Sequence, residues 1–192
     1  MLEHLSGAQP FPHPLATLDY ALRSVADQPG MALEFGVYTG GTLRAIARGR
    51  HGQEVYGFDS FEGLPADWRP GFDTGHFALT GDAANAIDVP GATLVKGWFD
   101  ESLPDFLASH LGPAAFIHID CDLYSSTRTV LTLLRPRLVP GTVIVFDEFF
   151  NFPGWEQHEY RAWTEFVDET GIVFEYLAYA ADGWNVAVKI TK

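Results

Sequence analysis

Basic residues, cysteines and long apolar runs are all scarce in this chain of 192 residues. Lys and Arg number 12 against 25 Asp and Glu, so the formal net charge is −13 and the chain lacks the basic surface that nucleic-acid binding requires. The one cysteine, Cys121, excludes an internal disulfide framework and a thiolate metal site, which fits a reducing cytoplasm. No apolar run approaches the ~18 residues of a membrane span, and the N-terminus lacks a signal-peptide pattern. We therefore expect a soluble cytoplasmic protein that binds neither nucleic acid nor a membrane.

Length and composition predict one domain. With 47% hydrophobic and 19% charged residues, the chain can build one sizeable core and is short for two. We expect residues 1–192 to form a single domain, with residues 1–28 as an N-terminal extension that contains one helix at about 14–28. The 15 phenylalanines and 5 tryptophans indicate surplus apolar surface, which favours a homodimer.

Strand-like and helix-like segments alternate along most of the chain. Apolar runs of strand length occur at 31–37, 54–59, 92–97, 114–120 and 142–148. Segments with helical spacing lie between them, at 42–50, 100–110 and 123–138. This alternation predicts a doubly wound α/β sheet with right-handed crossovers.

The C-terminal part departs from that alternation. A helix-like, aromatic segment at 155–170 is followed by two strand-like runs, 172–180 and 184–190, which the short turn Ala181-Asp182-Gly183 makes antiparallel. A parallel sheet closed by such a hairpin distinguishes the fold of methyltransferases that use S-adenosylmethionine (SAM) from a dinucleotide-binding Rossmann fold. We predict a Rossmann-like sheet of seven strands in the order 3-2-1-4-5-7-6, with the last strand antiparallel.

The turn after the first strand is rich in glycine but lacks the Gly-x-Gly-x-x-Gly spacing of dinucleotide sites. Glu34 lies inside the strand, ahead of the glycines, and the next helix begins near Thr42. Free N–H groups at that helix start favour a ligand carboxylate, although a mere tight turn would have the same glycines.

Asp59 ends the second strand about 25 residues further on, where a carboxylate can accept hydrogen bonds from both hydroxyls of a ribose. SAM contains a ribose and no pyrophosphate, so it fits this pair of features better than NAD does. A capping aspartate is the alternative for Asp59.

Gly97 and Trp98, after the third strand, are well placed for the adenine. The candidate cofactor-binding residues are Glu34, Gly36, Tyr38, Gly40, Gly41, Thr42, Asp59, Ser60, Gly97, Trp98 and Asp120.

Several blocks of the sequence, in order, resemble the macrocin O-methyltransferase (TylF/MycF-like) family. They are Val55 to Pro65, Val95 to Phe99 with Ser102-Leu103-Pro104, His118 to Thr127, and Phe146-Asp147-Glu148. The resemblance runs from about residue 33 to the C-terminus. It implies SAM binding and metal-dependent O-methylation, often of a sugar hydroxyl.

Acidic residues follow two neighbouring strands of the expected sheet. The fourth strand ends in Asp120-Cys121-Asp122 and the fifth in Asp147-Glu148, so four carboxylates should meet at the carboxyl edge, where ligands bind. Oxygen ligands suit Mg²⁺, with Mn²⁺ or Ca²⁺ as alternatives, and acidic caps that face solvent would leave the same pattern. By resemblance, Asp120, Asp147 and Glu148 would be the metal ligands and Asp122 the general base. The family often has two adjacent aspartates where Asp147-Glu148 stand.

Two histidines and the long connection at 60–91 complete the candidate site. His158 follows the fifth strand and is a candidate catalytic or substrate-binding residue, whereas His118 is better explained as a packed or hydrogen-bonded side chain. A connection as long as 60–91 is usually functional or mobile.

The expected function is SAM-dependent O-methylation of a hydroxyl on a small molecule, a sugar or another natural-product moiety, assisted by a divalent metal. The alternatives are a metal-independent methyltransferase, a SAM-binding protein without catalysis, and an oxidoreductase that uses a dinucleotide.

Overall fold

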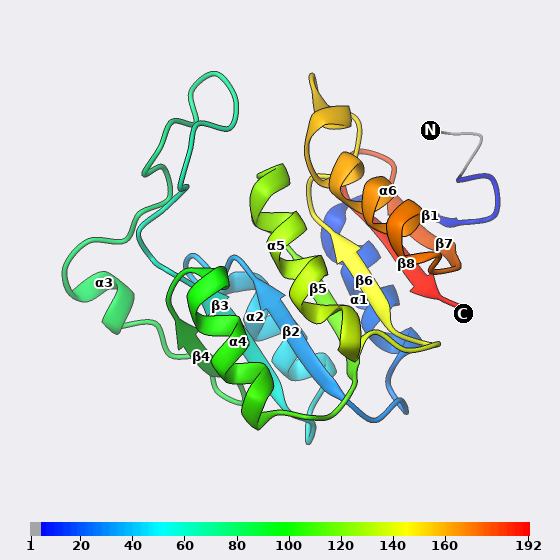
Figure 1. Ribbon diagram of the computed structural model, residues 1–192, viewed down its shortest axis with the longest axis horizontal. Helices are drawn as coiled ribbons and strands as arrows, with labels where there is room; N and C mark the ends of the chain where they lie inside the picture. Colours follow the sequence, from blue (N-terminus) through cyan, green and yellow to red (C-terminus); the bar gives the residue numbers. More distant parts are fainter. Residues whose placement is uncertain (1–4) are drawn as a thin grey trace.

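The computed structural model describes residues 5–192, which form one mixed sheet with helices on both faces (Figure 1). The strands are β1 (Gln9–Phe11), β2 (Met31–Phe35), β3 (Val55–Asp59), β4 (Thr93–Lys96), β5 (Ala114–Ile119), β6 (Val143–Phe146), β7 (Phe174–Ala180) and β8 (Val186–Ile190). Their order across the sheet is β1-β7-β8-β6-β5-β2-β3-β4. Strand β8 is antiparallel to both β6 and β7, as the expected terminal hairpin requires.

The sheet has one strand more than the seven expected. Strands β2 to β8 follow the expected order, and β1 adds to the edge of β7 in a parallel register in which Pro10 pairs with Tyr179. Strand β1 has only three residues, two of them exposed, so it contains no apolar run by which the sequence could have indicated it. Proline is tolerated there because an edge strand needs fewer backbone donors than a central one. Part of the N-terminal extension therefore belongs to the sheet; residues 1–4 lie outside the described residues.

Five longer helices and three short ones connect the strands. They are α1 (Pro14–Ser24), α2 (Gly41–Gly49), α3 (Asp82–Asn85), α4 (Phe99–Ser109), α5 (Tyr124–Leu134) and α6 (Glu159–Thr170), with 3₁₀ turns η1 (Arg135–Arg137) and η2 (Trp155–Gln157). Helix α6 begins later than expected because Gly154, with φ +85°, starts a separate turn ahead of it. None of the helices within residues 5–192 is long and apolar enough to cross a membrane.

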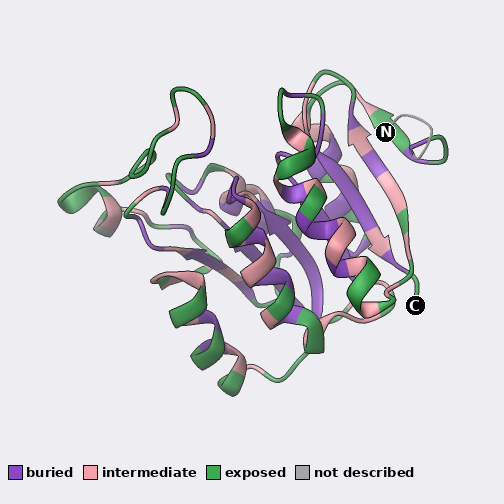
Figure 2. Cartoon of the chain, turned by 45° about the horizontal axis from the view of Figure 1, so that its top comes forward, coloured by how far each residue is buried: buried purple, intermediate pink, exposed green. Residues whose placement is uncertain are grey.

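Two apolar cores lie on the two faces of the sheet. One joins the sheet to α4, α5 and α6, and the other joins it to α1 and α2. Strands β2, β5 and β6 are buried along their whole length, while the outer faces of the helices are exposed (Figure 2). Any polar side chain on these central strands is therefore held away from water.

Candidate active site

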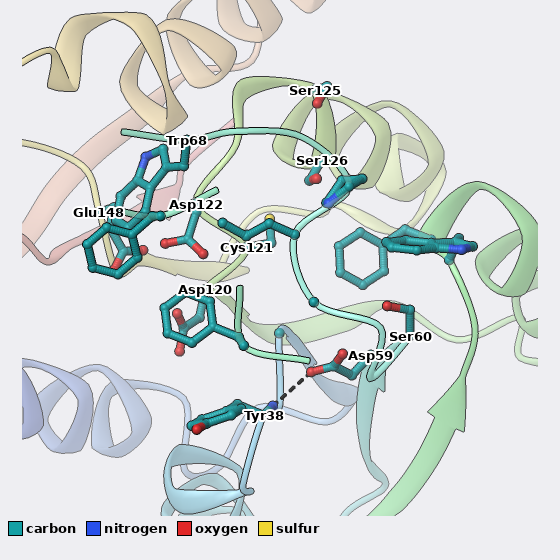
Figure 3. A pocket seen from close by; sticks show the side chains of 18 of the residues that line it. Tyr38, Asp59, Ser60, Trp68, Asp120, Cys121, Asp122, Ser125, Ser126 and Glu148 are labelled. Carbon is teal, nitrogen blue, oxygen red and sulfur yellow. Dashed lines mark hydrogen bonds between the residues drawn. The ribbon is translucent and has the colours of Figure 1, made fainter. Parts of the chain in front are cut away.

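A cavity of about 620 Å³ opens at the carboxyl ends of the strands. Its walls come from the turn after β2, the end of β3, the 60–91 connection, the starts of α4 and α5, and the segments after β5 and β6. Figure 3 shows Asp120, Asp122 and Glu148 on one side of this pocket and Asp59 and Ser60 on the other. Carboxyl edges of doubly wound sheets are where ligands bind in such folds.

The turn after β2 is tied to the end of β3 by Asp59. The N–H groups of Val37 and Tyr38 both donate to Asp59 Oδ2 at 2.8 Å, and that of Phe61 donates to Asp59 Oδ1 at 2.7 Å. The bond from Tyr38 is marked in Figure 3. Tyr38 has a left-handed backbone, with φ +48°. Asp59 thus orders the cofactor-side turn, in addition to any role toward a ribose.

The backbone of the same turn passes very close to the strand end that carries Asp120. Gly36 has φ +93°, and a Cβ atom there would lie 1.7 Å from the carbonyl oxygen of Asp120. Only glycine allows both the conformation and the approach. The glycine-rich turn therefore also sets the position of Asp120.

The candidate cofactor residues divide into two groups. Those that line the cavity are Gly36, Tyr38, Asp59, Ser60, Trp98 and Asp120; those that do not are Glu34, Gly40, Gly41, Thr42 and Gly97. Glu34 is completely buried inside the sheet, where it contacts His118. Its part in cofactor binding stays a prediction, and its observed contact is with the acidic side of the site.

Asp122 stands on a strained turn. Its φ is +61°, and the N–H of Leu123 donates to the carbonyl of Cys121 at 2.6 Å, which closes a three-residue turn around it. Such a conformation is costly for a residue other than glycine and is common at functional sites. Burial, together with the negative charge of Asp147, raises the pKa of Asp122 from 3.8 to about 7.

Acidic side chains gather around Asp120. Ligand atoms of His118, Asp120 and Asp147 lie within 4.8 Å of one another. Burial raises the pKa values of Asp120, Glu148 and Glu159 well above their usual range, and neighbouring negative charge, above all that of Asp147, adds to this. Like charges held this closely favour either protonation or a shared cation.

His118 links this cluster to Glu34. The two residues are directly paired across β2 and β5, and His118 Nδ1 lies 3.0 Å from Glu34 Oε1, while Nε2 lies 3.5 Å from Asp147 Oδ1. Burial disfavours the charged imidazole, but the bonds to Asp147 and Glu34 outweigh it and raise the pKa of His118 well above its usual value. A protonated His118 has no free ring nitrogen for a metal and instead orients Asp147.

Asp147 receives a further hydrogen bond from the side-chain amide of Asn185. Although burial would raise its pKa, the hydrogen bond and charge of His118, followed by hydrogen bonds from Glu148 and Asn185, lower the pKa of Asp147, so this carboxylate is held in its ionised form. Asn185 directly precedes β8, far along the chain from Asp147, and the sequence gives no signal of this contact.

The residues present fit a divalent cation. Three buried carboxylate oxygens have no hydrogen-bond partner, namely Glu34 Oε2, Glu148 Oε2 and Glu159 Oε1. The other oxygen of Glu159 accepts from the N–H of Glu148 at 3.0 Å. An unpaired buried carboxylate oxygen is costly, and ionised oxygen donors are what hard cations prefer.

His158 lies outside the cavity. It packs edge-on to Trp68, with ring centroids 6.2 Å apart, and is tilted against Phe152 at the same separation. Burial lowers the pKa of His158, which favours its neutral form. Its role in catalysis or substrate binding stays a prediction without a contact in the cavity to support it.

The 60–91 connection supplies aromatic side chains and a cation that the sequence pattern did not indicate, and Trp68 lies beside Asp122 and Glu148 (Figure 3). Trp68, Phe72 and Arg69 line the cavity, and Trp68 and Leu64 join Leu123 and Phe152 in a small apolar cluster. The Arg69-Pro70-Gly71-Phe72 segment forms a turn in which Phe72 N–H donates to the Arg69 carbonyl at 2.8 Å. The dipeptide Pro70-Gly71, which is typical of tight turns, is the feature of the sequence that could have indicated it.

Three features together define the methyltransferase class of α/β folds. The doubly wound sheet ends in an antiparallel hairpin, its cavity lies at the carboxyl edge, and a carboxylate ends the second strand of the parallel part. Residues 33–149 match the methyltransferase domain family, and the chain belongs to that family. The protein is accordingly a SAM-dependent methyltransferase. The narrower macrocin family stays a prediction.

Two curated relatives and one solved structure show what the chain is similar to. It is 28% identical to an 8-demethyl-8-(2,3-dimethoxy-alpha-L-rhamnosyl)-tetracenomycin-C 4'-O-methyltransferase of Streptomyces olivaceus, over 87% of this chain and 74% of the relative. It is also 28% identical to a demethyldecarbamoylnovobiocin O-methyltransferase of Streptomyces niveus, over 73% of this chain and 62% of the relative. The crystal structure of the calicheamicin methyltransferase CalS11 aligns with a TM-score of 0.76 and 26% identity, over 91% of this chain and 77% of that one.

Proposed function

We propose that the protein transfers the methyl group of SAM to a hydroxyl of a small molecule, a sugar or another natural-product moiety, with the help of a divalent cation such as Mg²⁺. The observation that carries this proposal is the convergence of Asp120, Asp122, Asp147 and Glu148 beside the cavity of a methyltransferase. Both curated relatives described above are named for O-methylation, which supports the reaction type.

Asp120, Asp147 and Glu148 would hold the cation. Asp147 is kept ionised by His118 and Asn185, and Glu148 offers a buried oxygen without a partner. A divalent cation bound there supplies positive charge that orients an acceptor hydroxyl and makes it more acidic. The buried pair of Glu34 and His118 fixes the position of Asp147 from behind.

Asp122 would accept the proton. Its pKa of about 7 leaves a substantial ionised fraction near neutrality, and a general base works best when its pKa lies near the working pH. As the acceptor oxygen forms its bond to the methyl carbon, the bond from that carbon to the sulfonium sulfur breaks and the hydroxyl proton passes to Asp122. S-adenosylhomocysteine (SAH) and the methyl ether are then the products, and no covalent enzyme intermediate is needed. The remaining contribution of the chain is to hold the reactants in line.

Chelation tests the metal part of this proposal. With a glycosylated acceptor of the kind that the relatives methylate, EDTA should abolish transfer and excess Mg²⁺ should restore it. Asp147→Asn should weaken Mg²⁺ binding in calorimetry, while the exposed control Asp105→Asn should bind Mg²⁺ like the wild type. Full activity after chelation would overturn the metal role and leave a metal-independent methyltransferase.

A further inference from the structure

Arg69 carries the one positive charge among the residues of the described chain that line the cavity. The other charged residues that line the cavity are all acidic, namely Asp59, Asp100, Asp120, Asp122 and Glu148. Arg69 is partly buried, and a buried guanidinium nitrogen without a hydrogen-bond partner costs free energy unless a ligand compensates. Its placement therefore calls for an explanation beyond loop packing.

Three aromatic rings hold the guanidinium. Its carbon lies 4.3 Å from the ring centre of Trp68, 4.2 Å from that of Phe72 and 5.1 Å from that of Trp184. Stacking on ring faces fixes the plane of a guanidinium and leaves its N–H edge free for hydrogen bonds. Arg69 Nε has no hydrogen-bond partner, and none of the ion pairs within residues 5–192 involves Arg69.

The turn that carries Arg69 is itself well ordered. Pro70 and Gly71, the latter with φ +89°, suit the two central positions of a tight turn. In addition to the bond from Phe72 N–H, the N–H of Trp68 donates to the Phe72 carbonyl at 3.0 Å. Asp67 anchors the other side by accepting from the N–H and the hydroxyl of Thr74, both at 2.8 Å. The cation is thus presented by a rigid element.

Arg69 belongs to the acceptor end of the cavity. Trp184, on which it stacks, is adjacent to Asn185, which bonds to Asp147. Arg69 and Asp122 both line the cavity, and their chain neighbours Trp68 and Leu123 belong to the same apolar cluster. A ligand whose hydroxyl lies at Asp122 can therefore place a second group at Arg69.

We propose that the acceptor carries an anionic oxygen group, a phosphate or a carboxylate, and that Arg69 binds this group and selects for it. The planar fork of arginine matches the oxygen geometry of both anions. The acidic walls would otherwise repel such a ligand, so a local cation is needed for it to enter. This inference rests on the proposed hydroxyl methylation and narrows its substrate class.

Matched acceptors test the proposal. Methyl transfer from SAM is measured for wild type and Arg69→Gln with hexose and 6-deoxyhexose 1-phosphates, the corresponding methyl hexosides, and methyl hexuronides. Wild type should prefer an anionic acceptor over its neutral partner by about 10- to 100-fold in kcat/KM, the range expected of a charged hydrogen bond. Arg69→Gln should remove this preference by raising the KM of the anionic acceptor far more than that of its neutral partner. Whether phosphate or carboxylate ranks higher identifies the anion.

Two further variants separate recognition from packing. Arg69→Lys keeps the charge but loses the fork, so it should retain part of the preference, and Arg23→Gln, an exposed arginine on α1, should retain all of it. The proposal is overturned if wild type shows no preference in any pair, if Arg69→Gln weakens anionic and neutral acceptors alike, or if its effect falls on the KM of SAM. Calorimetric binding of the 1-phosphates to the SAH-loaded protein decides the role of Arg69 even if no hydroxyl is methylated.

Discussion

His118 Nδ1 lies 3.0 Å from Glu34 Oε1, and both side chains are completely buried between paired strands. On its other side the same imidazole faces Asp147. A carboxylate of the first parallel strand is thereby coupled, through one ring, to a carboxylate of the candidate metal site. Glu34 therefore acts on the chemistry of the cavity without lining it.

Replacing Glu34 by Gln should lower both stability and metal affinity. The substitution keeps the shape but removes the charge that favours a protonated His118, and breaking a buried ion pair costs about 3–5 kcal/mol. Urea unfolding and Mg²⁺ calorimetry measure the two effects. Glu175→Gln, an exposed change on β7, is the matched control. A variant with unchanged stability would show that the pair is not ionised.

Asp122→Asn should reduce kcat by roughly 10²- to 10⁴-fold, the usual contribution of a general base. Asparagine tolerates the left-handed backbone that φ +61° imposes, so the turn should survive. SAM and Mg²⁺ binding should consequently remain close to the wild-type values in calorimetry. Unchanged turnover would remove Asp122 from its role as base.

Gly36→Ala should destabilise the protein severely. The added Cβ would lie 1.7 Å from the Asp120 carbonyl, so β5 and the turn after β2 would have to separate. We expect a loss of more than about 3 kcal/mol, well beyond a typical single substitution. Gly112→Ala, where an added Cβ meets nothing within 4 Å, should change the unfolding free energy by less than about 1 kcal/mol. Similar unfolding midpoints for the two variants would contradict the close approach.

Without a metal, the protein should become less stable as the pH rises. A carboxyl group whose pKa is raised on folding contributes stability that is fully present below its ordinary pKa and is lost as the pH passes its folded value. For Asp122 this window runs from 3.8 to about 7, and Asp120, Glu148 and Glu159 act in the same direction. His118, whose pKa is also raised, adds a loss at higher pH.

Urea midpoints at pH 5.5 and pH 8 in EDTA measure this loss, and saturating Mg²⁺ should reduce it because a cation replaces the protons. A midpoint that rises with pH in EDTA would contradict the assigned shifts.

The sequence by itself determined the fold class and the acidic residues of the cavity. Apolar runs separated by helical segments require a parallel sheet, and the short turn at 181–183 requires an antiparallel hairpin, because both depend on local spacing alone. The rule that carboxyl ends of parallel strands share one edge was sufficient to bring Asp120, Asp122 and Glu148 to one cavity.

Only the tertiary structure decided which residues support that cavity. The strand β1, the pairing of Glu34 with His118 and the bond from Asn185 to Asp147 all depend on register between segments distant in the chain, which local patterns do not encode. The position of Arg69 depends likewise on the packing of its own turn against Trp184, which lies in the connection between β7 and β8. Strand periodicity gives the face on which a side chain lies, but packing selects the partner that it meets there.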